Sequence, residues 1–112
     1  MPRADSSSYR DADGNTLVLR GALSPRTRSA YQRIASGRGL APGASREDAW
    51  QRAVEFLFER LAESWTIADT PAITDQRELL GRLRMASTDE RRWVRTCIRE
   101  HCEANFPDLA AP

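Results

Sequence analysis

The longest regular pattern in the chain is a stripe of apolar side chains that recurs every three or four residues between positions 50 and 65. This spacing places them on one face of an α-helix, and that face has to pack against other elements. The stripe consists of Trp50, Ala53, Val54, Leu57, Phe58, Leu61 and Trp65. We therefore predict an amphipathic helix that opens at Ser45, with Asp48 completing a weak capping box.

Three further helices are predicted from their end signals. Ser24-Pro25 is typical of an N-cap followed by proline at the first helical position, and Gly37 of a left-handed helix end. Asp75 begins another helix. The last helix opens with the capping box Ser87–Glu90 and ends near 105–107.

The segment before the first helix holds one strand-like run, Thr16–Arg20. We expect residues 1–15 to be a poorly ordered lead-in and residues 16–112 to be a single helical domain. The turn residues 11–15 alternatively fold Tyr9 and Arg10 back as a hairpin. A lone hairpin is marginal in water, so this strand must pack on the helices or pair with another chain.

Together these patterns predict an all-α fold: four helices with one short N-terminal β-strand or hairpin, assembled as an intertwined homodimer. The expected core is Trp50, Val54, Leu57, Phe58, Leu61, Leu80, Leu83, Trp93, Val94, Cys97 and Ile98.

Two groups of side chains could take part in catalysis or metal binding. Cys97 and His101 share a helix face, with Cys102 adjacent, which is compatible with a nucleophile and its base, with half a metal site, or with core residues. We favour core residues, because the shared face is apolar and no further cysteine or histidine completes a zinc site. A row of glutamates, Glu55, Glu59 and Glu63, fits acid–base chemistry or, more commonly, a solvated salt-bridge face.

Charge is distributed unevenly along the chain. It has seventeen basic residues, all arginine, against sixteen acidic ones. Positions 14–46 carry six arginines and no acid, whereas positions 47–112 carry nine arginines and thirteen acids. The basic segment fits binding of nucleic acid, binding of peptide carboxylates, contact with the acidic half of a partner subunit, or a plain solvated helix.

The chain has no apolar run long enough for a membrane span and no secretory signal at its start. We expect a cytoplasmic protein that does not bind membranes.

The segment Leu23–Tyr31 contains a Ser-x-x-Thr-x-x-x-Tyr pattern and resembles the opening helix of the core-binding domain of phage integrases. That resemblance implies a small helical DNA-binding module. The catalytic domain of integrases is absent, and residues 66–112 have no counterpart in the core-binding domain.

Other stretches, Ala49–Leu61 and Arg84–Ser87 followed by Glu90–Arg95, resemble the small lysinoalanine-forming proteins of the cinnamycin and duramycin lantibiotic pathways. The resemblance implies a small, cytoplasmic, helical and dimeric protein that needs no cofactor. It also implies the activity: the protein binds a dehydrated, ring-bearing precursor peptide and joins a lysine amine to a dehydroalanine of the same peptide.

This reaction needs the two groups to be held together more than it needs a nucleophile or metal of the protein. Peptides of this class carry a hydroxylated aspartate, so we hypothesise that the substrate supplies the base. The catalytic residue of the protein, if there is one, stays unassigned. We expect Arg28 to hold peptide carboxylates and Tyr31 or Trp65 to pack on the peptide's rings.

Overall fold

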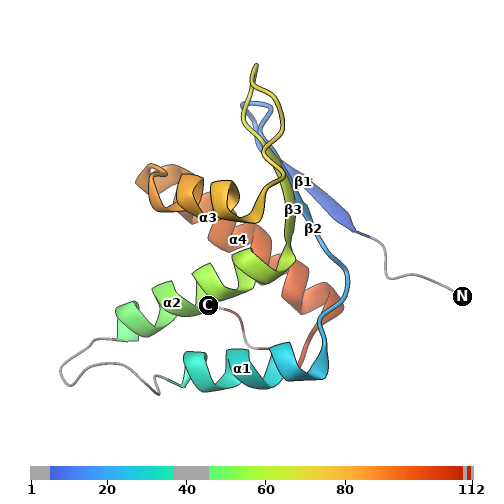
Figure 1. Ribbon diagram of the computed structural model, residues 1–112, viewed down its shortest axis with the longest axis vertical. Helices are drawn as coiled ribbons and strands as arrows, with labels where there is room; N and C mark the ends of the chain where they lie inside the picture. Colours follow the sequence, from blue (N-terminus) through green and yellow to red (C-terminus); the bar gives the residue numbers. More distant parts are fainter. Residues whose placement is uncertain (1–5, 37–45, 110, 112) are drawn as a thin grey trace, which may run out of the picture.

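The described part of the chain, residues 6–36, 46–109 and 111 of a computed structural model, forms four helices and one antiparallel sheet (Figure 1). The all-α prediction is therefore wrong: the sheet has three strands in the order β1-β2-β3. The elements, in chain order, are β1 (Ser7–Arg10), β2 (Thr16–Leu19), α1 (Pro25–Ala35), α2 (Arg46–Leu61), β3 (Ala62–Thr66), α3 (Gln76–Arg84) and α4 (Thr88–Asn105).

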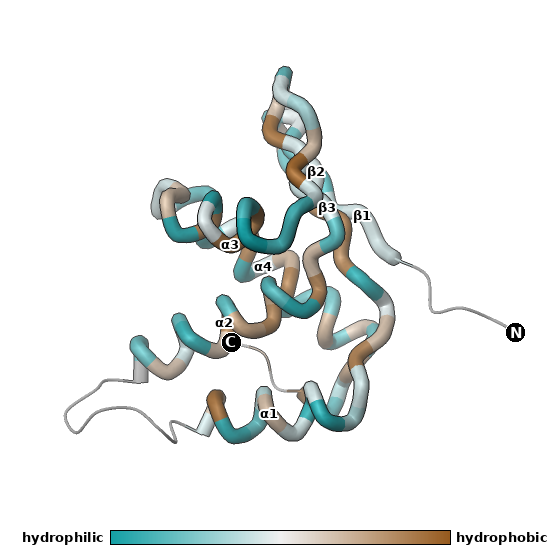
Figure 2. Tube along the Cα trace, in the orientation of Figure 1, coloured by the Kyte–Doolittle hydropathy of each residue, from teal (hydrophilic) through white to brown (hydrophobic). Residues whose placement is uncertain are grey.

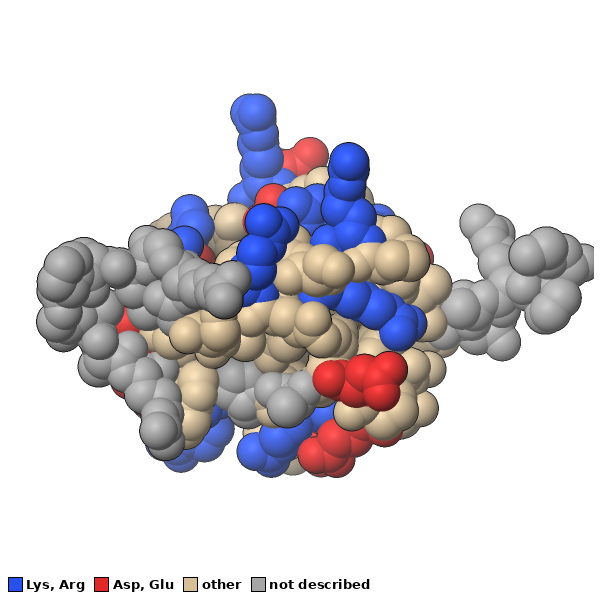
Figure 3. Space-filling view, turned by 90° about the horizontal axis from the view of Figure 1, so that it is seen from below, with Lys and Arg blue, Asp and Glu red and all other residues tan. Residues whose placement is uncertain are grey.

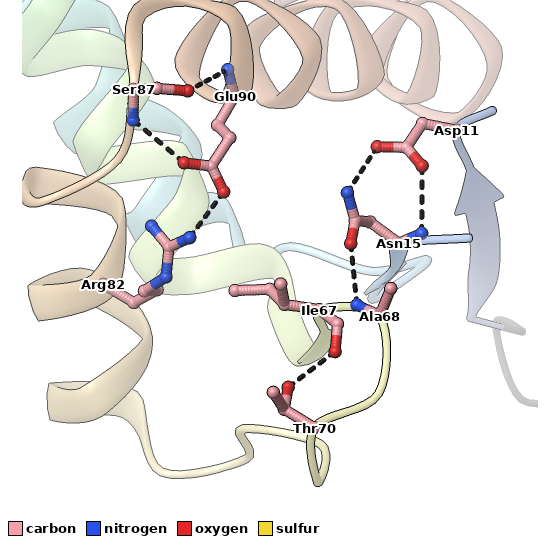
Figure 4. A network of polar contacts seen from close by, with 8 residues as sticks. All are labelled: Asp11, Asn15, Ile67, Ala68, Thr70, Arg82, Ser87 and Glu90. Atoms are coloured by element: carbon pink, nitrogen blue, oxygen red, sulfur yellow. Dashed lines mark hydrogen bonds and ion pairs between the residues drawn. The ribbon is translucent and has the colours of Figure 1, made fainter. Parts of the chain in front are cut away.

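The N-terminal hairpin exists because its turn satisfies its own polar groups. The Asp11 carboxylate accepts hydrogen bonds from the backbone N–H groups of Asp13 and Asn15, both at 2.9 Å, and Gly14 supplies a φ of 86°. The side-chain carbonyl of Asn15 accepts from the backbone N–H of Ala68 at 2.8 Å (Figure 4). The boundary that we expected between the lead-in and the domain, at residues 15 and 16, therefore falls inside a hairpin whose first strand is β1. Residues 1–5 of the expected lead-in lie outside the described residues.

The second correction concerns the end of the long helix. Helix α2 stops at Leu61, and β3 begins at Ala62 with no connecting residue, so Trp65 lies on a strand opposite Leu17. Pairing with β2 decides this, because the backbone N–H of Arg20 donates to the carbonyl of Leu61 at 2.8 Å where the ladder begins. The strand register shifts between Val18 and Leu19, and this irregularity lets Ala62 and Trp65 both be buried.

Helix ends are otherwise as predicted. Ser24 caps α1, Asp75 caps α3, and Ser87 and Glu90 form the full capping box of α4. The expected stop at Gly37 and the expected cap at Ser45 lie outside the described residues.

The core lies where α2, α4 and the sheet meet, and hydrophobic stretches of these elements are coloured brown in Figure 2. Eight predicted core residues are confirmed as buried: Val54, Leu57, Phe58, Leu61, Leu83, Val94, Cys97 and Ile98. Trp50, Leu80 and Trp93 are only half-buried. The prediction missed a second group of buried residues, which comes from the sheet and the C-terminal segment: Leu17, Leu19, Trp65, Phe106 and Leu109.

Replacing Leu17 with alanine tests whether β2 belongs to the core. Leu17 is fully buried, so we expect Leu17→Ala to lower the free energy of unfolding by about 2–5 kcal/mol. Val18, its half-buried neighbour on the strand, serves as the control, and Val18→Ala should cost clearly less. Urea unfolding followed by circular dichroism measures both; equal and small effects would contradict the placement of β2.

Candidate functional site

A cleft of about 310 Å³ opens between α2 and α4. Most of the side chains that line it are polar or charged, three of them arginines, and two are apolar. The lining residues are Glu47, Gln51, Val54, Leu83, Thr88, Arg91, Arg92 and Arg95. Val54 and Leu83 are buried and form an apolar floor, whereas the charged residues stand around it. We refer to this site as the α2–α4 cleft.

Helical periodicity aligns these side chains. Glu47, Gln51 and Val54 follow one another at spacings of four and three on α2, and Thr88, Arg91 and Arg95 at spacings of three and four on α4. Each wall of the α2–α4 cleft is therefore one face of one helix.

The turn between α3 and α4 determines where α4 begins and therefore where the cleft arginines of α4 lie. Glu90 closes the capping box with Ser87 and also accepts a hydrogen bond from Arg82 on α3 at 2.5 Å (Figure 4). These donors stabilise the ionised carboxylate and lower the pKa of Glu90, although partial burial opposes them. The guanidinium of Arg91 donates to the backbone carbonyl of Arg84 at 2.5 Å, which holds this arginine at the turn.

The other two cleft arginines are only loosely paired. Arg95 lies over the ring of Trp50, 5.1 Å from its centroid, and its Nη1 is 3.8 Å from Oε1 of Glu47. Nη1 of Arg92 is 3.9 Å from Asp89, and the Arg92 side chain is 74% exposed. Such long, exposed ion pairs contribute little to stability, so these guanidinium groups can bind another anion. The α2–α4 cleft is suited to a ligand that carries both an anionic and an apolar group.

The three residues predicted to bind substrate lie elsewhere and are not gathered in the α2–α4 cleft. Tyr31 on α1 and Trp65 on β3 are 2% and 1% exposed, so neither ring offers a surface for a peptide to pack on. Arg28 lies over the ring of Phe106 at 5.2 Å, and its buried Nε has no hydrogen-bond partner among the described residues. Their role in substrate binding stays a prediction, and in the structure all three contribute to packing.

His101 is a fully buried structural residue that joins α4 to the N-terminal hairpin. Its Nε2 is 2.6 Å from the carbonyl oxygen of Arg20, which can only accept, so Nε2 carries the proton and donates. In the neutral ring Nδ1 then accepts from the hydroxyl of Tyr9 at 2.8 Å. Both ring nitrogens are thus occupied within the described part of the chain, which agrees with our preference for a core role over a catalytic base.

The two cysteines are also core residues. Both are buried, and burial raises the pKa of the Cys97 thiol to about 12 and that of the Cys102 thiol to about 11. Each is therefore a neutral thiol near neutral pH, whereas a nucleophilic cysteine has to be a thiolate.

The predicted glutamate row does not form. Glu55 is paired with Arg84 at 3.0 Å, Glu59 is exposed, and Glu63 lies on β3, where it accepts a hydrogen bond from Ser6 and lies 3.8 Å from Arg20. The salt-bridge interpretation holds for Glu55 and Glu63, because each contacts an arginine.

Sequence reasoning missed the arginines of α4. Arg91, Arg92 and Arg95 lie at helical spacing on one face, and this signal was present in the sequence. The net charge does not indicate this cluster of arginines, because the second half of the chain is acidic as a whole.

No protein-family model matches the chain, and no curated protein or solved structure shows significant similarity to it. None of the described helices is long and apolar enough to cross a membrane. In residues 6–36 and 46–109, no three His, Cys, Asp or Glu side chains are grouped as a metal site would require.

The buried thiols predict a loss of stability at alkaline pH. In the unfolded chain they ionise near their ordinary pKa of 9.0, and in the folded chain only near 11 and 12. Above about pH 9 the unfolded state therefore binds fewer protons, and the free energy of unfolding falls by up to about 1.4 kcal/mol per thiol and pH unit.

Urea unfolding under reducing conditions between about pH 8 and about pH 10.5 measures this slope. Tyr31, whose pKa burial raises from 10.0 to about 12, adds to it at the upper end of that range. The double variant Cys97→Ala, Cys102→Ala should show a flatter slope even if it is less stable at neutral pH. An unchanged slope would show that the thiols are not the cause.

Proposed function

We propose that this protein binds a dehydrated, ring-bearing lantibiotic precursor peptide and promotes the addition of a lysine amine to a dehydroalanine within that peptide. One observation carries the proposal. The stretches that resemble lysinoalanine-forming proteins, 49–61 on one side and 84–87 with 90–95 on the other, contribute to opposite walls of the α2–α4 cleft. These stretches, without positions 88 and 89, supply five of its lining residues: Gln51, Val54, Arg91, Arg92 and Arg95.

The reaction is compatible with such a cleft because it needs no group to be transferred from the protein. The lysine nitrogen bonds to the terminal carbon of dehydroalanine, and the alkene electrons move to the α-carbon. The ammonium loses a proton and the α-carbon gains one, so nothing is oxidised, reduced or released. Holding the reacting atoms about 3–3.5 Å apart then accounts for much of the acceleration.

The buried state of the residues that could act as nucleophile or base also supports the proposal. Cys97, His101 and Cys102 are at most 4% exposed. A carboxylate of the substrate, its hydroxylated aspartate, remains the most direct base for the lysine ammonium. The protein would then act mainly by binding and shaping the peptide, and we propose a homodimer in the cytoplasm as its working form.

Co-incubation with a dehydrated, ring-bearing precursor peptide tests the proposal. We expect the free lysine amine to disappear without a change in peptide mass, because the addition is an isomerisation. Amine-directed labelling followed by mass spectrometry measures this loss. An amine that stays fully reactive in the presence of folded protein would contradict the proposed function.

Single substitutions test whether the base belongs to the peptide. Cys97→Ala, Glu55→Gln and Glu59→Gln should each leave the cross-linking rate largely intact, provided that circular dichroism shows an unchanged fold. A loss of about 10³ or more from any one of them would instead indicate acid–base or nucleophilic catalysis by the protein.

A second candidate, DNA binding, is favoured by the outer surface of α1. Arg26 and Arg33 are exposed, their helix has no acidic residue in its first turn, and neither has an ion-pair partner in the described part of the chain. Figure 3, which looks onto the end of the molecule where α1 lies, shows several projecting basic side chains; acidic ones are most prominent at the lower right and also appear near the top.

Fluorescence anisotropy with a short labelled duplex distinguishes this candidate. If α1 follows a phosphate backbone, affinity should fall steeply with salt, and Arg26→Gln with Arg33→Gln should reduce the log–log slope by about one per arginine. Arg99→Gln, an exposed arginine on α4, is the matched control. The absence of binding at low salt would exclude DNA as the ligand.

A further inference from the structure

We infer that the α2–α4 cleft binds an acidic residue of a peptide, and that Glu47 occupies the position of that residue's carboxylate while the cleft is free. The inference rests on the proposed function for the origin of the peptide. The binding step itself requires no cross-linking, so it can be measured separately.

Glu47 is placed as an internal substitute for the ligand. It is the only carboxylate among the described residues that line the cleft, and it faces Arg95 across the opening at 3.8 Å. That distance is longer than a direct hydrogen bond, and the Glu47 side chain is 71% exposed. The pair is therefore loose, and a carboxylate that approaches Arg95 closely can displace Glu47.

Arg95 is prepared for such a ligand. Its guanidinium lies over the Trp50 ring, a cation–π contact that favours this position of the group, and the side chain is only 34% exposed. A planar guanidinium can hold both oxygens of one carboxylate with two parallel hydrogen bonds, which a lysine ammonium cannot do. Arg91, anchored on the Arg84 carbonyl, adds a second positive charge at the same wall.

The floor of the cleft favours a peptide over other anions. The lining combines a little exposed surface of Val54 with the aliphatic stems of the arginines, and an apolar side chain next to the acidic residue can cover it. A nucleic-acid backbone fits poorly, because Glu47 at the opening and Asp89 beside Arg92 would repel its phosphates. Positions 47–112, the part of the chain that supplies the residues of the cleft, carry thirteen acids against nine arginines and are therefore acidic overall.

The probe is an N-acetylated, C-amidated Leu-Asp-Leu peptide, whose only charge is one carboxylate, titrated into the ¹⁵N-labelled full chain and followed by NMR. We expect amide shifts in the first half of α2 and the first turns of α4. The matching Leu-Asn-Leu peptide, which lacks the charge, should bind about tenfold more weakly.

Two variants with matched controls test the assigned roles. Arg95→Gln should weaken binding of the Asp peptide about tenfold, whereas Arg99→Gln, further along α4, should not. Glu47→Gln removes the competing carboxylate and should strengthen binding about two- to fivefold, whereas Glu59→Gln on α2 should have no effect.

Several results would overturn the inference: equal binding of the Asp and Asn peptides, shifts confined to α1, unchanged affinity of Glu47→Gln, or tighter binding of inorganic phosphate than of the Asp peptide. They leave the proposed function separately testable. Cross-linking without binding of the Asp peptide in the cleft would refute only this inference, whereas binding without cross-linking would refute the proposed function.

Discussion

The pairing of β2 with β3 is the constraint on which the rest of the structure depends. A two-stranded hairpin is marginal alone, and β3 completes a sheet that buries Leu17 and Leu19 against the helices. Because β3 follows α2 without a connecting residue, the direction of the sheet also fixes the direction in which α2 leaves it. One wall of the α2–α4 cleft is thus set by strand pairing at the far end of the same helix.

The opposite wall depends on a different interaction, the junction of α3 with α4. Glu90 serves both as the capping-box residue of α4 and as the partner of Arg82, so one carboxylate determines where α4 starts and how it lies against α3. The arginines of the cleft follow within two helical turns. The apolar interior, in contrast, takes up the thiols and the imidazole, and the groups left to meet a ligand are guanidinium groups, which bind and orient anions.

The sequence predicted elements with strong local signals and missed those that depend on distant partners. The caps at Ser24, Asp75 and Ser87 are local hydrogen bonds, and the structure confirms all three. In contrast, Leu61 and Trp65 lie at helical spacing, but the chain leaves the helix between them because a strand forty-odd residues earlier offers a ladder. The same holds for the predicted substrate-binding residues. Large aromatic residues such as Trp65 were expected to pack on a ligand, yet they are buried and fill the core.

The most direct test of the account is amide hydrogen exchange of the full chain with and without a dehydrated, ring-bearing precursor peptide. Binding in the α2–α4 cleft predicts slower exchange in the first half of α2 and in the first two turns of α4, with α1 unchanged. Slower exchange confined to α1, or unchanged exchange throughout while the peptide becomes cross-linked, would contradict it.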